Sequence, residues 1–542
     1  MTGGGAVEQE QPESPPTPPP PSSGLGAALI AAGILLSRAL AFVREALRAR
    51  YLGAGAAADA FTAAFRLPNL LQNLFGEAAL SASFIPVYAR LLGKDEREAG
   101  KVAGAVAAVM ALGTSIFVLV GILIAPVLVS VVNPGFSPEK KALTVHLARI
   151  LFPGSGLFVL SAWCLGILNS HRRFFLSYAA PVAWNLALIA ALLVFGPRHS
   201  DNRLVVMLAF ASVVGALLQF AVQLPLVLRL VPHLRIAYDT ASPHVRTVLR
   251  NFTPAFVSRG AGQLGAYIDQ FLASFLPNGA PAMLGYAANL YLLPVSLFGM
   301  SVSAAELPEM ARTRSETPEE LATLRSRVSA AARRIAYFIV PSAVAFLALG
   351  DVLIAAVFQS GQFRRTETLF TWGILAGSAI GLLAGTLARL YSSTLYALHD
   401  THTPLRYATT RFLVSAAVGA VLALPTPRWL GIDQRWGTAG LTAAGALGGW
   451  VEFMLLRRTI RRRIGGVGVP MRYGALLWGA AALAAASATA ARVAVAGFGR
   501  FTAAVALAGA FGVVYLVATY AAGVPEAAAV VGRVRRRSRM RR

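Results

Sequence analysis

The segment VAGAVAAVMALGTSIFVLVGILIAPVLVSVV, residues 102–132, has no charged side chain and is apolar on almost every face. At a rise of about 1.5 Å per residue, an α-helix of this length more than crosses the roughly 30 Å hydrocarbon core of a bilayer. A membrane β-strand would instead show about ten residues of alternating polarity, which this run lacks. The segment therefore predicts a membrane-spanning helix.

Comparable apolar windows recur along almost the whole chain and decide the fold class. Hydrophobic residues make up 56% of the 542 residues and charged residues only 13%, whereas about a quarter of the residues in soluble domains are charged. We predict an all-α polytopic membrane protein with about fourteen transmembrane helices. The expected helices cover residues 25–50, 57–93, 102–132, 142–169, 176–196, 203–230, 247–276, 282–304, 328–358, 368–396, 405–424, 438–456, 472–495 and 501–523.

The number of helices suggests how the chain is organised. It allows one six-helix bundle in residues 25–230, a second in 247–456, and two further helices in 472–523. Transporters use such a duplication to build a central site between two lobes, although no internal sequence similarity proves it here. We expect two lobes around a central cavity, with most of the polar membrane residues in the first lobe.

The two ends of the chain lie outside these bundles. Residues 1–24 contain PPTPPPP and many other polar or Pro residues, so we expect a disordered cytoplasmic arm and not a signal peptide. Residues 524–542 form a basic cytoplasmic tail that can touch anionic headgroups. The single cysteine, Cys164, excludes an intramolecular disulfide framework and a cysteine-based metal cluster.

The formal net charge of +25 does not indicate a nucleic-acid partner, because Lys and Arg accumulate in the cytoplasmic loops of membrane proteins. The connections after the even-numbered helices hold HRR (171–173), ARTR (311–314) and RRTIRRR (457–463). The connections after the odd-numbered helices hold far fewer basic residues. This asymmetry predicts that both termini face the cytoplasm.

Several predicted helices carry polar side chains at bilayer depth, where an ionisable group costs about 2.5–3.5 kcal/mol and usually lines a cavity or is paired. In the first helix, Arg38 and Glu45 share one face, and Arg44 and Arg48 stack one turn apart. The other candidates are Asp59, Arg66, Asn73 and Glu77 in the second helix, Arg259, Gln263, Asp269 and Gln270 in the seventh, and Asn289 in the eighth. Because guanidinium groups bind phosphate oxygens in bidentate fashion, this arginine-rich set favours an anionic ligand.

Structural roles for these residues remain open as alternatives. Arg44 and Arg48, together with Arg50, could snorkel near a helix end, while Asp59 and Arg66 could form an internal pair that holds two helices together. Pro68 should also kink or break the second helix, because it removes an amide donor.

The segment SRALAFVREALRARYLGAGAAADAFTAAFRLPNLLQNLFGEAALSASFIPV, residues 37–87, resembles the N-terminal signature of the MurJ (MviN) family, the lipid II flippases of the MATE-like exporter superfamily. The resemblance runs from about residue 25 to 525. Further matching blocks are NPGF (133–136), RILFP (149–153), LGILNSHRRF (165–174), VFQSGQF (357–363) and LYALHDTHTP (395–404).

The resemblance implies a V-shaped, fourteen-helix transporter with a cationic cavity between two lobes and a lipid-tail groove near the last two helices. Arg38, Arg44 and Asp59 match the family's functional polar positions, and Glu45 stands where the family usually has aspartate. The implied partners are lipid II, which is an undecaprenyl-pyrophosphate-linked substrate, and membrane lipids. We expect a monomer in the bacterial inner membrane.

Two positions depart from the family pattern. Gln72 and Asn73 follow LPNLL where the family usually has arginine, and Asn289 replaces an arginine of the eighth helix. Arg259 is a candidate for the compensating charge, and the alternative is that it lies at headgroup level and compensates nothing.

The resemblance also raises the question of an ion. Some relatives bind sodium through an aspartate of the seventh helix, and Asp269 stands at the matching place, with Asp400 as a weaker second candidate. Asp400 could equally cap a helix start. The sequence requires no cofactor, and it leaves open whether sodium, protons or the membrane potential drives the cycle.

The sequence favours a transporter over an enzyme. Its seven histidines are scattered, and no His, Asp and Glu group has the spacing of a catalytic or metal site. We predict that the chain flips lipid II from the inner to the outer leaflet by alternating access. The alternative is an exporter of a drug or of another polyprenyl-linked glycan, which the missing arginines would favour.

Overall fold

The computed structural model describes residues 24–75, 80–81, 83–239, 241–311 and 317–539, and only their backbone at 24–31, 71, 74–75, 253–264, 266, 304, 308, 311 and 533–539. The described residues form helices, turns and loops, with no strand among them. The longer helices are α1 (Gly24–Leu52), α2 (Ala56–Phe75), α5 (Glu96–Val132), α6 (Pro138–Ser170), α8 (Pro181–Phe195), α9 (Asp201–Leu230), α10 (Pro243–Ala273), α11 (Ala280–Pro294), α12 (Ser301–Ala311), α13 (Pro318–Phe358), α14 (Arg365–Ile380), α15 (Leu382–Ala397), α16 (His402–Ala423), α18 (Gly437–Ile464), α19 (Met471–Ala490), α20 (Arg500–Ala521) and α21 (Pro525–Arg539). The shorter ones are α4 (Ile85–Leu92), α7 (Phe174–Ala179), the π-helix η1 (Val295–Met300), α17 (Pro425–Trp429) and the 3₁₀-helix η2 (Gln434–Trp436).

Each of the fourteen expected segments contains a helix or a broken helix, so the all-helical membrane fold is confirmed. In the described part of the chain, 10 helices are long and apolar enough to cross a membrane, or 11 if the pair α14 and α15, bent by 43°, counts as one span. The other three expected spans are α1, α2 and α10, and parts of α1 and α10 lie outside the residues whose side chains are described. These three helices carry most of the charged candidates.

The second expected helix, 57–93, is divided in the structure. The α-helix continues through Pro68, and α2 ends at Phe75. Residues 76–79 are not described, and α4 begins separately at Ile85. We expected a kink or break at Pro68, but the helix continues through the proline, and the division lies beyond it.

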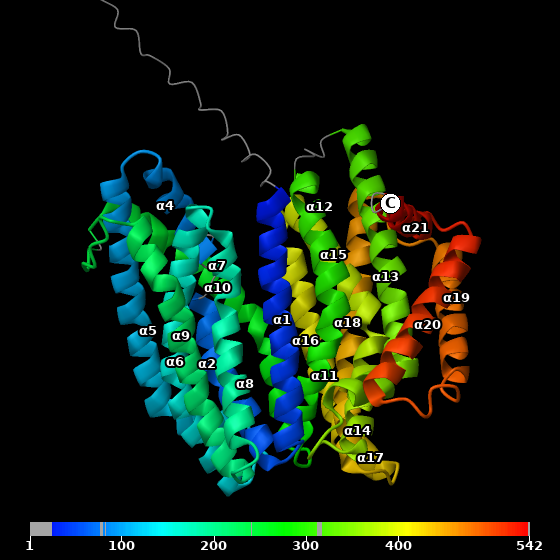
Figure 1. Ribbon diagram of the computed structural model, residues 1–542. Coiled ribbons are helices and arrows are strands. Elements are labelled where there is room, and N and C mark those ends of the chain that lie inside the picture. Colours follow the sequence, from blue (N-terminus) through cyan, green and yellow to red (C-terminus); the bar gives the residue numbers. More distant parts are fainter. Residues whose placement is uncertain (1–23, 76–79, 82, 240, 312–316, 540–542) are drawn as a thin grey trace, which may run out of the picture.

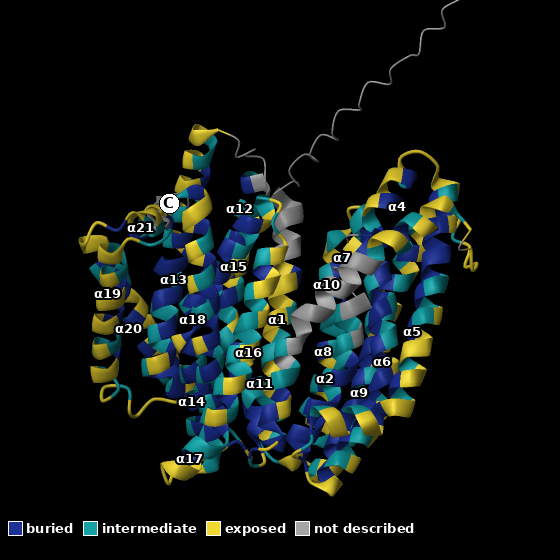
Figure 2. Ribbon diagram, turned by 180° about the vertical axis from the view of Figure 1, so that it is seen from behind, coloured by how far each residue is buried: buried dark blue, intermediate teal, exposed yellow. Residues whose placement is uncertain are grey.

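The helices form two lobes that stand side by side in Figure 1. We call α1, α2 and α4–α9 the N-lobe and α10–α18 the C-lobe. α19 and α20 pack together against α13, at the outer side of the C-lobe. α10 lies between the lobes, because it contacts α2 and α5 on one side and α16 and α18 on the other. Figure 2 gives the same arrangement from behind, with α10 again between the lobes.

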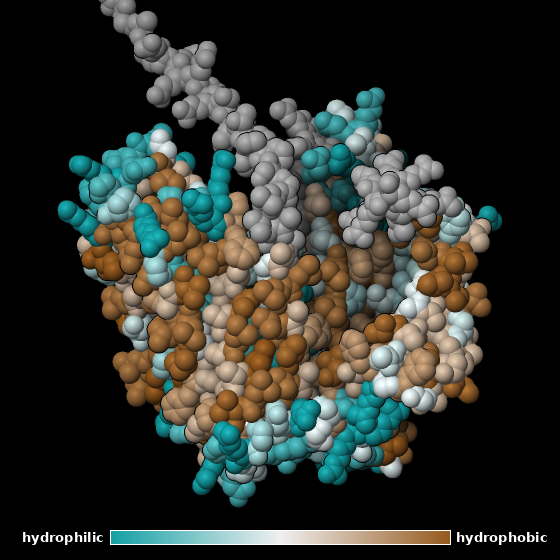
Figure 3. Space-filling model, viewed as in Figure 1, coloured by the Kyte–Doolittle hydropathy of each residue, from teal (hydrophilic) through white to brown (hydrophobic). Residues whose placement is uncertain are grey.

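The surface has the distribution of a membrane protein. In Figure 3, hydrophobic side chains form a broad middle band, and hydrophilic side chains gather at the upper and lower ends. Leu119, Leu123 and Val127 of α5, for example, are 59%, 66% and 63% exposed. Such a band of exposed apolar side chains is stable only against lipid.

The two lobes are fastened together at the lower end of Figure 1, where α1 ends and α2 begins. Here Gln270 Nε2 donates to Asn133 Oδ1 at 2.6 Å, and the Tyr286 hydroxyl donates to the Gly53 carbonyl at 3.0 Å. Gly279 has a φ of +100°, and an added Cβ would collide with the Ala54 carbonyl. We call this region the latch; its other main residues are Asp59, Lys140, Ser274 and Gln362.

Candidate functional site

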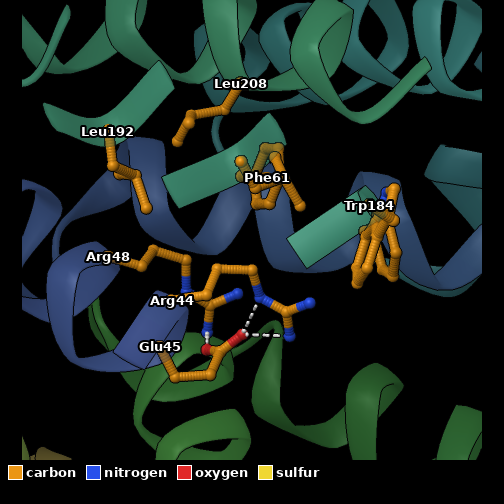
Figure 4. Close-up of a pocket in the computed structure, with 9 residues that line it drawn as sticks. Arg44, Glu45, Arg48, Phe61, Trp184, Leu192 and Leu208 are labelled. Atoms are coloured by element: carbon orange, nitrogen blue, oxygen red, sulfur yellow. Dashed lines mark hydrogen bonds and ion pairs between the residues drawn. The ribbon is translucent and has the colours of Figure 1, made fainter. Parts of the chain in front are cut away.

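An arginine–glutamate–arginine cluster on α1 faces the inside of the N-lobe (Figure 4). Arg44 Nη2 lies 2.8 Å from Glu45 Oε1, and Arg48 Nη2 lies 2.8 Å from Glu45 Oε2. The three residues are consecutive or one turn apart on one helix, so their backbone alone keeps them together. With two guanidinium groups and one carboxylate, the cluster keeps one net positive charge.

Aromatic and amide groups fix the orientation of the two arginines. Arg44 Nη1 donates to Asn185 Oδ1 at 2.8 Å, and its guanidinium carbon lies 4.4 Å from the centre of the Trp184 ring. The guanidinium carbon of Arg48 lies 4.8 Å from the ring centre of Tyr286, which belongs to the C-lobe. Both guanidinium groups therefore have partners inside the protein.

The cluster borders a small cavity of about 70 Å³. Its other walls are apolar, and they are formed by Phe61, Phe65, Trp184, Leu188, Leu192 and Leu208. A net positive charge beside apolar walls is poorly solvated, which strengthens its attraction for an anion.

Arg38 lies two turns nearer the upper end of α1 and is exposed. Its Nη1 donates to the Ser296 hydroxyl of η1 at 3.1 Å, which joins the lobes at that level. The structure records no carboxylate partner for Arg38 among the described residues.

Asp59 lies in the latch, away from the α1 cluster, and is completely buried. Its Oδ2 accepts from Lys140 Nζ at 2.6 Å and from the Gly279 amide at 2.7 Å, and its Oδ1 accepts from the Ala282 amide at 2.9 Å. The internal pair that we weighed for Asp59 therefore exists, but its partner is Lys140 and not Arg66. Sequence reasoning missed Lys140, although a Lys is rarely as buried as this one, at 6% exposed, unless it is paired.

A second pair of charges joins two helices of the C-lobe. Arg411 Nη1 of α16 lies 3.2 Å from Glu452 Oε2 of α18. Arg66 of α2 and Asp269 of α10 lie on helices that contact each other, and the Tyr267 hydroxyl of α10 donates to the Arg66 carbonyl at 3.1 Å. Sequence reasoning missed Arg411 and Glu452, although each is an ionisable residue inside an expected membrane helix.

The other candidates have more local surroundings. Asn289 is half-buried and donates to the Gly285 carbonyl of its own helix at 2.9 Å, and Gln270 belongs to the latch. Gln72 and Asn73 are half-buried. Glu77 and the side chains of Arg259 and Gln263 lie outside the described residues.

Asp400 takes the capping role that we left open. It accepts from the Thr403 amide at 2.9 Å and from the Thr403 hydroxyl at 2.7 Å, and it pairs with Arg463. Burial acts to raise the pKa of the Asp400 carboxyl. The hydrogen bonds from Thr403 and the charge of Arg463 outweigh that effect and hold the pKa below its usual range. Asp269 and Asp400 have different neighbours, and the described residues contain no group of three or more His, Cys, Asp and Glu arranged to hold a metal ion.

Known proteins resemble this chain over most of its length. The family described as lipid II flippase MurJ matches residues 48–521. A probable lipid II flippase MurJ of Rhizobium tropici is 33% identical over 439 residues, which cover 79% of this chain and 79% of the relative. The lipid II flippase MurJ of Burkholderia cenocepacia is 31% identical over 439 residues, which cover 79% of this chain and 82% of the relative.

Solved structures share the fold. A lipid II flippase MurJ in an inward closed conformation has a TM-score of 0.74 at 22% identity and covers 91% of this chain and 98% of its own. A multidrug resistance MATE family transporter in an inward-facing conformation has a TM-score of 0.59 at 16% identity and covers 81% of this chain and 98% of its own.

Proposed function

This chain belongs to the MurJ family of lipid II flippases, and on that premise we propose that it moves lipid II across the bacterial inner membrane by alternating access. It is a transporter and not an enzyme. The observation that carries the mechanism is the unequal contact between the lobes, which are latched at one end and carry arginines facing the interior above the latch.

The proposed ligand site lies on α1. Arg38 and the cluster of Arg44, Glu45 and Arg48 together carry two net positive charges, which suit the pyrophosphate of the substrate. Neutralising the pyrophosphate lets the head group cross without entering hydrocarbon, while the lipid tail stays in the membrane. Arg259, whose side chain is not described, remains our candidate for a further charge.

The proposed orientation places the termini in the cytoplasm and the latch on the periplasmic side. This orientation follows from the excess of Lys and Arg in the connections at the upper end. In this arrangement the latch closes the outer side, so the substrate enters from the cytoplasmic leaflet. Opening of the latch would then release the head group outward.

The proposed path for the lipid tail runs along α19 and α20. Their outward side chains are apolar and exposed, including Leu483, Phe501, Val505, Val513 and Val517. Among the described residues, the main packing partners of the two helices besides one another are α13 and α21. The structure thus leaves one face of this pair open to lipid, and we propose that the protein acts as a monomer.

The test is complementation of a bacterial strain depleted of its own lipid II flippase, combined with an assay of lipid II exposure on the outer leaflet. Growth together with lipid II exposure supports the proposal. Stable insertion without either result would contradict it and favour another polyprenyl-linked glycan as the substrate.

A further inference from the structure

The C-terminal end of α18 carries a groove lined by arginines, far from the α1 cluster in sequence and on another helix. The groove has a volume of about 430 Å³ and is lined by Met454, Arg457, Arg458, Arg461 and Arg462. All five side chains are exposed. The neighbouring Arg463 is paired with Asp400, whereas no ion pair is recorded for the four arginines of the groove among the described residues.

The groove opens away from the interior of the C-lobe. At about 100° per residue, Ala443, Leu447, Met454, Arg457 and Arg461 fall within roughly 80° of one another on α18. Glu452, which pairs with Arg411 toward the interior, falls on the opposite side of the helix. Leu447 and Met454 are 46% and 60% exposed, as expected of side chains that face lipid.

The same face of α18 leads to a second, apolar groove nearer the lower end. This groove is about 470 Å³ in volume and lies between α13, α14 and α18. Its lining consists of Leu347, Trp372, Gly373, Ala376, Gly377, Ile380, Trp436, Ala439, Gly440 and Ala443. From Arg457 to Leu447 the helix rises by about 15 Å, which matches the roughly 15 Å of one leaflet's hydrocarbon. An acyl chain that starts at the arginines therefore lies along Met454 and Leu447 and ends before the apolar groove.

Helix-end arginines alone do not require a ligand, because they favour the negative end of a helix dipole and are typical of cytoplasmic ends. That explanation covers Arg461 and Arg462 in the last turn. The dipole does not explain Arg457 and Arg458, which lie more than a turn earlier, and the cytoplasmic location of all four arginines does not require them to line one groove together with an apolar residue. Four guanidinium groups around one groove repel one another unless an anion lies between them.

We propose that this groove binds an anionic phospholipid, with the phosphate held by the four arginines and an acyl chain lying along Met454 and Leu447. The site is separate from the α1 cluster and does not carry the transported head group. In the proposed orientation, its ligand comes from the cytoplasmic leaflet. Guanidinium groups next to the apolar side chains of Met454 and Leu447 match the phosphodiester and acyl chain of a lipid better than they match a free anion.

The experiment measures lipid binding by the purified full chain in vesicles of phosphatidylcholine with increasing phosphatidylglycerol. The test variant is Arg457→Gln/Arg461→Gln, and the matched control is Lys94→Gln/Arg97→Gln, which removes the same charge from exposed residues at the same end of the molecule. We expect the parent and the control to retain phosphatidylglycerol equally. The test variant should bind it about 30-fold more weakly, as expected when two basic contacts are lost.

Three results would overturn the proposal. They are equal phosphatidylglycerol binding by the test variant and the control, equal retention of phosphatidylcholine and phosphatidylglycerol by the parent, and full displacement of phosphatidylglycerol by millimolar inorganic phosphate. Lipid II exposure is measured in parallel. If the test variant loses lipid II binding but keeps phosphatidylglycerol, the groove belongs to the transport path and the proposal fails, while the proposed function stands.

Discussion

Replacing Asp59 by Asn should open the latch between the lobes. Asp59 is completely buried, and its carboxylate holds Lys140 of the N-lobe together with the amides of Gly279 and Ala282 in the C-lobe. Asparagine has nearly the same shape and can still accept one or two of these hydrogen bonds. It removes the charge, however, and leaves the Lys140 ammonium buried without a counter-ion.

The expected cost follows from the burial of the pair. Breaking a buried ion pair by removing one partner costs about 3–5 kcal/mol. The Asp59 carboxylate accepts hydrogen bonds from both lobes, so much of this cost falls on the latched arrangement and not on either lobe alone. If about 3 kcal/mol does so, the latched population falls by roughly 100-fold relative to the open one.

The assay is thiol labelling in the latch. Ser274 is 2% exposed, and its hydroxyl accepts from the Gly135 amide at 3.1 Å, so Ser274→Cys introduces a nearly isosteric thiol between the lobes. The native Cys164 is completely buried and adds little background. We expect the thiol introduced by Ser274→Cys to react between tenfold and about 100-fold faster with a membrane-impermeant maleimide when Asp59→Asn is added.

Two controls separate latch opening from general damage. Glu98→Gln breaks an exposed pair with Lys101, at 3.2 Å, and should leave the labelling rate unchanged. Asp59→Asn/Lys140→Gln should label more slowly than Asp59→Asn alone, because it leaves no unpaired buried charge. An unchanged labelling rate in Asp59→Asn, with expression and melting temperature preserved, would refute the reasoning.

Three further predictions follow from the described contacts. Arg38→Ala and Arg44→Ala should each abolish complementation while the protein stays inserted and abundant, and growth of both variants would rule out anion binding on α1. Reporter fusions after Pro134 should read periplasmic and fusions after Arg173 cytoplasmic, and the reverse pattern would refute the proposed orientation. Because the folded-state pKa of Asp400 is lowered, its stabilising effect is present above the ordinary Asp pKa of about 4 and is lost as the pH falls through the lower folded-state pKa, so Asp400→Asn should reduce the melting temperature more at pH 6 than at pH 2.

The sequence was sufficient to predict the membrane-spanning helices because hydropathy is a local property of each segment. Runs such as residues 102–132 predict a span without reference to any neighbour, and α5 covers that run. The division of 57–93 was expected at the wrong place because Pro68 was the only visible interruption. A helix in a membrane protein can continue through proline when neighbouring groups satisfy the freed carbonyl.

Contacts between distant helices were much harder to predict. Lys140 is 81 residues from Asp59, and nothing local in the PEKK sequence at the start of α6 indicates a buried lysine. Arg411 and Glu452 carried a better signal, because two opposite charges inside neighbouring apolar helices usually pair. They were missed because the prediction rested on the helices with the most polar residues.

The effect of lacking the family arginines at Gln72 and Asn289 depends on where the remaining charges lie and on whether they are paired. Arg411 and Glu452 form an ion pair whose charges sum to zero. Removing Arg411 would therefore leave Glu452 unpaired and cost stability, whatever its effect on transport.

Among the described candidate residues, a positive excess lies instead on α1. Arg38, Arg44 and Arg48 contribute three positive charges and Glu45 one negative charge, which leaves two. Helix α1 contacts the N-lobe through α7 and α8 and the C-lobe through α13, so a ligand on its arginines is held where the lobes move relative to each other. In the proposed mechanism, an anion bound there would change the balance between the two arrangements without needing an arginine from α2 or α11. The proposed α1 site would thus explain why the chain can lack arginines at two positions of the family pattern.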